Sequence, residues 1–269
     1  MHIYFTLLSL VAGLCLGFSV LYFFIGLRRK EDKWLNLTFA LFAFGYAATL
    51  IDGIRWYSAT TVAEYVSVER WDAIFVTLAF VALIWYVAIY TGVRPLILLW
   101  PLSAAFILIG IVHIVRPNLM YESIQGLSYI ELPWGESLAQ LDGSDSVWMS
   151  LFLVALLLTL GFIMYAFIRQ YRRGERQAAA ILGLGMLWFV FTIFYEILGQ
   201  SGVIAYFPIG EFGFLGIAIA MSLQLANSVI KTEEELARHR QNLVETHVSN
   251  DRQLLRWGVT GCGVFSYFT

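Results

Sequence analysis

Seven polar side chains that could bind a ligand lie in or beside strongly apolar segments of the chain. They are Asp52, Arg55, Asp72, His113, Tyr195, Glu196 and Glu211. A charged side chain at the centre of a bilayer costs about 2.5–3.5 kcal/mol on insertion scales, so such residues tend to face a cavity or one another. If the apolar segments cross a membrane, all seven side chains map to its outer half. The pattern predicts a polar ligand-binding pocket that opens to the outside.

A second interpretation of these residues needs no ligand. Charged side chains close to a helix end can reach the lipid headgroups at small cost, and Asp52 and Arg55 have the i, i+3 spacing of an ion pair on one helix. Both interpretations stay open. Glu196 is the stronger single candidate because it follows the largely apolar run 189–194. A lone histidine such as His113 is more often satisfied at the membrane interface than used as a ligand.

No metal, cofactor or catalytic residue is predicted. The remaining histidines and the two cysteines show no metal-ligand spacing: His2, His239, His247, Cys15 and Cys262. The last apolar segment has no lysine inside the bilayer for a retinal Schiff base, and serine and aspartyl intramembrane protease patterns do not occur. Glu233-Glu234-x-x-x-Arg238 matches one membrane-protease signature but lies in a solvated stretch. We therefore expect a protein that is not an enzyme.

Composition points to the membrane as the main solvent of this chain. Of 269 residues, 59% are hydrophobic and only 13% are charged, and the mean hydropathy is +0.74. A soluble globule of this size needs more charge on its surface. The net charge of −2 makes nucleic acid an unlikely partner.

Seven apolar stretches of about 20 residues predict an all-α, polytopic membrane protein with seven transmembrane helices. The expected helices cover residues 3–27, 34–56, 61–92, 95–116, 147–168, 177–198 and 212–230. A capping box, Thr61-x-x-Glu64, begins the third, and Pro95 begins the fourth. The seventh is expected to continue into the charged tail, since residues 215–257 contain one glycine and no proline.

Basic residues are concentrated on one side of these segments. If the N-terminus lies outside, cytoplasmic segments hold 14 of the 17 basic residues: Arg28, Arg29, Lys30, Lys33, Arg94, Arg169, Arg172, Arg173, Arg176, Lys231, Arg238, Arg240, Arg252 and Arg256. The positive-inside rule therefore places the N-terminus outside and the C-terminus in the cytoplasm. The expected location is the inner (cytoplasmic) membrane, as a multi-pass protein.

One long outer loop, Pro117–Ser146, separates the fourth and fifth segments. Its β-tolerant residues around Gln125-Gly126 predict a short β-hairpin that turns at this point. Loops longer than about 12–15 residues are usually functional or disordered. The aromatic content favours a packed lid over the pocket, and a passive connector is the alternative.

A seven-residue repeat begins at the end of the last apolar segment and continues past it. Val229, Leu236 and Leu243 are flanked by charged residues, which is typical of a helix that pairs with a second copy and transmits a signal. A single surface helix is the alternative. The expected domains are a transmembrane region (1–230), a cytoplasmic linker helix (231–245) and an atypical tail (246–269).

Several short motifs occur in a characteristic order: Phe39-Ala-Leu-Phe-Ala-Phe-Gly-Tyr46, Thr61-Val-Ala-Glu-Tyr65 with Arg70-Trp71, Tyr90-Thr-Gly-Val-Arg94-Pro95, Pro117-Asn118-Leu119, Ile124-Gln-Gly-Leu127 and Trp134-Gly-Glu136. In their order and spacing, residues 1–245 resemble the N-terminal seven-helix membrane region of bacterial sensor histidine kinases and related PAS-containing signalling proteins. The resemblance implies the input module of a two-component system, whose last helix continues into a coiled coil, PAS domains and a kinase core.

The chain departs from this family after residue 245. Residues 246–269 show no PAS, kinase or cyclase pattern, so we expect the output domain to be missing, as in a truncated or frameshifted gene. The expected function is a membrane-embedded sensory region with an unknown stimulus ligand, membrane lipid as its surroundings and a homodimer as its assembly. A small-solute transporter is the alternative, and an intramembrane enzyme is the third and least favoured.

Overall fold

The chain forms a bundle of long helices with two β-strands across one end. The computed structural model describes residues 3–30, 32–116, 120–174, 176–200 and 208–264. Its elements are α1 (Ile3–Arg28), α2 (Lys33–Tyr57), α3 (Val62–Thr91), α4 (Leu96–Val115), β1 (Tyr121–Glu131), β2 (Ser137–Asp145), α5 (Val147–Arg172), α6 (Arg176–Gln200), the 3₁₀ helix η1 (Gly210–Phe212) and α7 (Gly213–Val264). A helix covers each apolar stretch of the sequence. The largest difference before α7 is at α5, which continues four residues past the expected end.

The boundaries of α3 follow from its capping residues. Thr61 Oγ1 accepts a hydrogen bond of 3.2 Å from the Glu64 N–H group, which confirms the expected N-cap. The Glu64 carboxylate accepts from the Thr60 N–H group at 3.0 Å, one residue earlier than in a standard capping box. At the other end Gly92 adopts the left-handed conformation, with φ of 64°, and closes the helix.

Five helices, α1 to α5, are long and apolar enough to cross a bilayer, among the residues that the structure describes. The shortest of them, α4, has 20 residues, which span about 30 Å at 1.5 Å per residue. The chain is therefore a multi-pass membrane protein. Helix α6 contains a shorter apolar run, Ala179–Tyr195, and the crossing of the membrane by α6 and α7 stays a prediction.

Small residues bring α2 and α4 close to α3. A Cβ atom at Gly45 of α2 would lie 2.9 Å from the backbone of Phe75 and Ala79, and one at Gly110 of α4 would lie 2.3 Å from Thr77 Oγ1. Close approach at small residues is typical of helices that associate in lipid.

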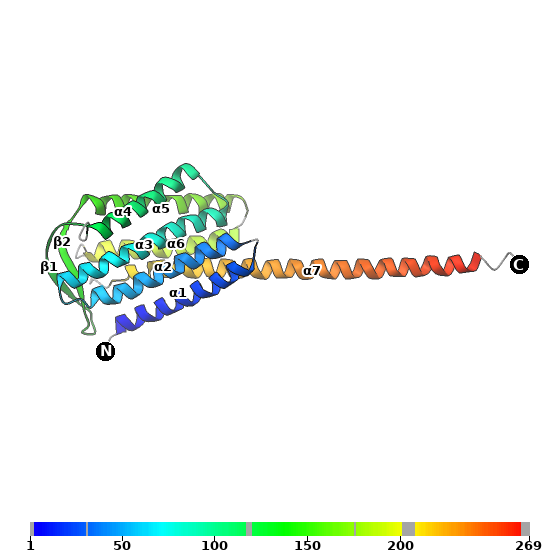
Figure 1. Ribbon diagram of the computed structural model, residues 1–269, viewed down its shortest axis with the longest axis horizontal. Coiled ribbons are helices and arrows are strands. Elements are labelled where there is room, and N and C mark those ends of the chain that lie inside the picture. Colours follow the sequence, from blue (N-terminus) through cyan, green and yellow to red (C-terminus); the bar gives the residue numbers. More distant parts are fainter. Residues whose placement is uncertain (1–2, 31, 117–119, 175, 201–207, 265–269) are drawn as a thin grey trace. The chain divides into compact units, whose positions relative to one another are not determined.

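The strands β1 and β2 form an antiparallel pair in the 117–146 loop. Figure 1 shows that they cross the end of the bundle at which α1 begins; we refer to this as the hairpin end. The expected turn at Gln125-Gly126 is wrong. Gly126 lies inside β1, opposite Asp142 and next to an irregularity in the register.

The turn lies instead at residues 132–136, between two buried leucines. Leu132 N–H donates to the Glu136 carbonyl group at 2.7 Å, and Gly135 has a φ of 82°, a conformation that favours glycine. Leu132 and Leu138 both enter the core formed with α1 and α2. Burial of these two side chains on either side of the turn explains why the chain reverses here and not at Gly126.

Helix α7 is unbroken from Gly213 to Val264, which confirms that the seventh helix continues into the charged tail. Contacts divide the chain inside this helix into two compact units, Met1–Ser222 and Leu223–Thr269. Within the second unit Leu236 is 55% exposed and Val229 is half-buried, whereas the side chain of Leu243 lies outside the described residues.

Candidate functional site

Two aspartates are buried where α2 and α3 meet, near the hairpin end. Asp52 of α2 and Asp72 of α3 are only 5% and 4% exposed. On one side of the two aspartates along the α2–α3 interface, Gly45 contacts α3 at Phe75. On the other side, the Trp56 ring stacks on the Tyr65 ring. Because the two helices run antiparallel, these contacts place Asp52 and Asp72 at a similar height.

Two further acidic residues join these aspartates. The Asp72 carboxyl group interacts electrostatically with those of Glu211, Asp52 and Glu69. Glu69 lies one helical turn before Asp72, and Glu211 comes from η1, immediately before α7. We call Asp52, Glu69, Asp72 and Glu211 the carboxylate cluster.

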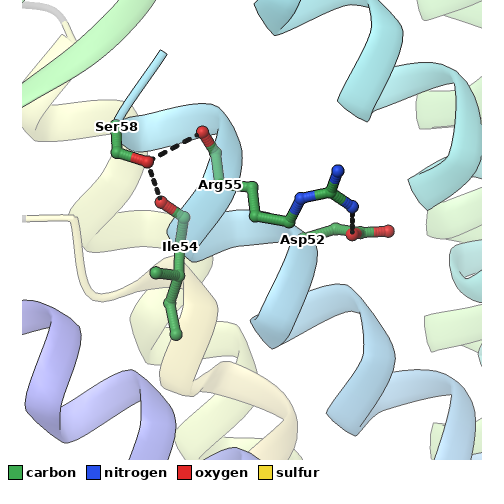
Figure 2. Close-up of polar contacts among 4 residues, drawn as sticks. All are labelled: Asp52, Ile54, Arg55 and Ser58. Carbon is green, nitrogen blue, oxygen red and sulfur yellow. Dashed lines mark hydrogen bonds and ion pairs between the residues drawn. The ribbon is translucent and has the colours of Figure 1, made fainter.

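Asp52 has one basic partner. Arg55 Nη1 lies 3.1 Å from Asp52 Oδ1, which confirms the i, i+3 pair expected from the spacing. Figure 2 shows the Arg55 side chain folding back along α2 to reach a single carboxylate oxygen. The Arg55 side chain is 61% exposed and the Asp52 side chain 7%. Because solvent screens the exposed guanidinium, the pair contributes no more than about 1 kcal/mol.

Within the described part of the chain, four buried oxygen atoms at this level have no hydrogen-bond partner: Thr49 Oγ1, Asp52 Oδ2, Glu69 Oε2 and Asp72 Oδ1. Thr49 does lie beside Asp72, but their geometry falls outside that of a hydrogen bond. A buried polar atom without a partner costs about 1–3 kcal/mol. An oxygen-rich site of this kind suits a hydrogen-bond donor or a cationic group. Among the described residues, however, no group of three acidic, histidine or cysteine side chains has the geometry to hold a metal ion.

Two tyrosines of α2 hold Glu211. The Tyr57 hydroxyl group donates to Glu211 Oε1 at 3.0 Å, and the Tyr46 hydroxyl group donates to the Glu211 carbonyl oxygen. The two tyrosines are eleven residues apart, close to three helical turns, so they lie on the same face of α2. The Phe214 ring in the first turn of α7 packs against Tyr46 at 5.4 Å. The start of α7 is therefore fixed to α2 by polar and aromatic contacts.

The hairpin turn is connected to the start of α1. Glu136 is buried, and its Oε2 atom accepts from the Tyr4 N–H group at 3.0 Å and from Trp134 Nε1 at 2.8 Å. A carboxylate at this position satisfies a free N–H group of the first helical turn and complements the helix dipole. The Tyr4 hydroxyl group donates to the Pro208 carbonyl oxygen at 3.1 Å, just before η1.

Strand β2 packs on Tyr65, next to the carboxylate cluster. Ala139 and Leu141 of β2 are buried against Ala59 and Tyr65, and the Tyr65 hydroxyl group interacts electrostatically with Glu69, among other groups. The hairpin therefore packs on the helix ends next to the carboxylates, and its role as a lid stays a prediction.

The remaining candidates are His113, Tyr195 and Glu196. His113 is 2% exposed and neither of its ring nitrogens has a hydrogen-bond partner, but among the described residues it is not one of those that act on Asp72. The Tyr195 ring contacts the Phe191 ring at 6.5 Å within α6. Glu196 belongs to α6, but its side chain lies outside the described residues.

Comparison with known proteins assigns no family: no protein-family model matches this chain, and no curated protein matches it. The carboxylate cluster, the hairpin and the start of α7 are therefore the features from which a function is inferred.

Proposed function

We propose that this protein is the sensory input region of a membrane signalling protein, of the type found in PAS-containing histidine kinases. The observation that carries the proposal is the position of Glu211. This residue belongs to the carboxylate cluster, is held by Tyr46 and Tyr57, and lies in η1, two residues before the first residue of α7. A ligand that binds the cluster therefore acts on the first residues of the helix that leads to the linker.

The proposed mechanism is a shift between two arrangements of η1 and α7. A stimulus that donates hydrogen bonds to Asp52 or Asp72 changes the electrostatic field at Glu211. It thereby changes the hydrogen bond between Tyr57 and Glu211. Such a ligand shifts the equilibrium only as far as its affinities for the two arrangements differ. The output is a change in pairing of the linker helices of two copies through Val229, Leu236 and Leu243.

The proposed orientation places the hairpin outside the cell and the linker helix in the cytoplasm, with seven spans in the inner membrane. The distribution of basic residues supports it. Reporters fused to the two termini of the full chain test it, because alkaline phosphatase is active only outside the cytoplasm and green fluorescent protein exported in unfolded form does not fluoresce there. Both termini on one side of the membrane would contradict the seven-span topology.

Disulfide cross-linking of the linker helix in native membranes tests the signalling role. With Cys15 and Cys262 replaced by serine, Leu236→Cys is expected to cross-link to a second copy far more efficiently than Ala237→Cys on the neighbouring face. Glu211→Gln is expected to change the Leu236→Cys yield, whereas Ser58→Ala, which removes only bonds within α2, leaves it unchanged. Equal yields at both positions, or no effect of Glu211→Gln on a folded protein, would refute the proposal.

A small-solute transporter is the second candidate, because buried carboxylates at membrane depth also mark transport pathways. Uptake of labelled solutes into vesicles that contain the full chain distinguishes the two. Uptake that depends on Asp72, together with linker cross-linking that is the same in the Glu211→Gln variant, would favour the transporter.

A further inference from the structure

A groove of about 550 Å³ lies between α1 and α2, away from the carboxylate cluster. Its walls are the second half of α1, from Ser19 to Phe24, and the first half of α2, from Trp34 to Phe44. Several wall residues are apolar and exposed, among them Val20, Phe24 and Leu41.

Apart from the indole of Trp34, the polar side chains that line this groove among the described residues are already engaged. Its two hydroxyl groups already donate to helix backbones: Ser19 Oγ to the Ala40 carbonyl oxygen at 2.9 Å, and Thr38 Oγ1 to the Trp34 carbonyl oxygen at 2.8 Å. Beyond Trp34, an occupant therefore finds dispersion contacts with hydrocarbon, which favours an alkyl chain.

The length of the groove corresponds to one leaflet of a bilayer. Ser19 lies nine residues before the end of α1 at Arg28, and Phe44 lies eleven residues after the start of α2 at Lys33. At 1.5 Å per residue these distances are about 14 and 17 Å. Half of a hydrocarbon core of about 30 Å is about 15 Å, so one acyl chain fits between the helix ends and the bilayer centre.

Positive charge is concentrated where the groove ends. The connection between α1 and α2 holds Arg28, Arg29, Lys30 and Lys33 against two acids, Glu31 and Asp32. Arg28, Lys30 and Lys33 are exposed. Trp34 is 69% exposed at the same level, as is typical of an aromatic side chain at the membrane interface.

We propose that this groove is a binding site for an anionic phospholipid. One acyl chain lies between α1 and α2, and the phosphate-containing headgroup contacts Arg28, Lys30 and Lys33. The groove between α4 and α5 is a natural comparison. It is apolar and about half as large, at about 290 Å³. Basic residues also lie near the start of α4, where Arg173 Nη1 donates to the Thr91 carbonyl oxygen at 3.1 Å, so the size of the groove is the main difference.

Native mass spectrometry of the full chain tests the proposal. The protein is purified in a neutral maltoside detergent and titrated with dioleoyl phosphatidylglycerol or dioleoyl phosphatidylcholine. We expect phosphatidylglycerol to be retained preferentially, and its retention to fall as salt increases. Lys30→Gln and Lys33→Gln should each weaken retention about fivefold, since a basic residue near an anionic lipid surface contributes about 1 kcal/mol.

Filling the groove provides the second test. Val20→Trp is expected to abolish preferential retention of phosphatidylglycerol, whereas Leu108→Trp in the α4–α5 groove preserves it. Equal retention of the two lipids by the unmodified chain would overturn the proposal. So would unchanged retention in the two lysine variants, or efficient disulfide formation between copies through Val20→Cys, which would identify a second copy of the chain as the occupant.

Discussion

The Tyr57 hydroxyl group donates a 3.0 Å hydrogen bond to Glu211 Oε1, between residues 154 positions apart in the sequence. This bond joins the end of α2 to η1, the 3₁₀ helix that immediately precedes α7. It also connects α7 to the carboxylate cluster, because Glu211 interacts electrostatically with Asp72. The same part of the bundle therefore holds the buried charges and the start of the helix proposed to transmit the signal.

Tyr57→Phe is expected to lower the free energy of unfolding by about 1–3 kcal/mol, because it removes one hydrogen bond to a carboxylate and keeps the ring. The ring contact with Tyr4, at 5.7 Å, is retained in this variant. The measurement is the melting temperature of the detergent-purified chain. Tyr165→Phe on the exposed face of α5 is the matched control. Equal melting temperatures for the two variants would show that the bond to Glu211 contributes nothing.

Asp72→Asn is expected to stabilise the protein by an amount of the order of 1 kcal/mol, since it removes one of several like charges close together. The side chain is buried, and no described residue forms a hydrogen bond with its Oδ1 atom. Asp142→Asn, at an exposed position of the hairpin, serves as the control and should not change the melting temperature. A lower melting temperature for Asp72→Asn would mean that its charge stabilises the fold.

Glu136→Ala is expected to destabilise the hairpin end by roughly 2–4 kcal/mol, because both hydrogen bonds to Oε2 are lost. Glu136→Gln keeps an acceptor and should lose about half as much. The measurements are the melting temperature and the rate of proteolytic cleavage within residues 120–145. Glu131→Ala, at an exposed position of β1, controls for the loss of an acidic side chain. Cleavage at the same rate in both alanine variants would argue against the connection from Glu136 to α1.

Gly45→Ala is expected to cost about 1–3 kcal/mol, the usual range for overpacking. The added methyl group would lie 2.9 Å from backbone atoms of α3, which cannot move aside as a flexible side chain could. Gly17→Ala in α1 is the matched control because nothing lies within 4 Å of its Cβ position. If the two variants melt at the same temperature, α2 and α3 are not in close contact at Gly45.

The positions of the helices could be predicted from the sequence because local rules determine them. Apolar stretches of sufficient length, the Thr61 cap and the absence of glycine and proline from residues 217–257 predicted helices that the structure describes close to their expected bounds. The i, i+3 pair of Asp52 and Arg55 was also predictable, since both residues lie on one helix. The position of the hairpin turn was not predictable in this way. Local turn propensity favoured Gly126, whereas burial of Leu132 and Leu138 in the bundle placed the turn between them.

The composition of the candidate site was decided by tertiary structure alone. Sequence reasoning included Asp52, Asp72 and Glu211 but missed Glu69, and it missed the tyrosines and the hairpin glutamate that hold the site together. The eleven-residue spacing of Tyr46 and Tyr57 was the available signal for the tyrosines, but it identifies a shared helix face and not what that face contacts.

The sequence by itself therefore determined that this chain is a helical, multi-pass membrane protein, because hydrophobic length and helix caps act over a few turns of one segment. Which polar groups meet at the hairpin end depended on the antiparallel arrangement of α2 and α3 and on the return of the chain at η1. Contacts such as Tyr57 with Glu211 and Tyr4 with Glu136 join residues more than 130 positions apart. Only the folded bundle brings such residues within hydrogen-bonding distance.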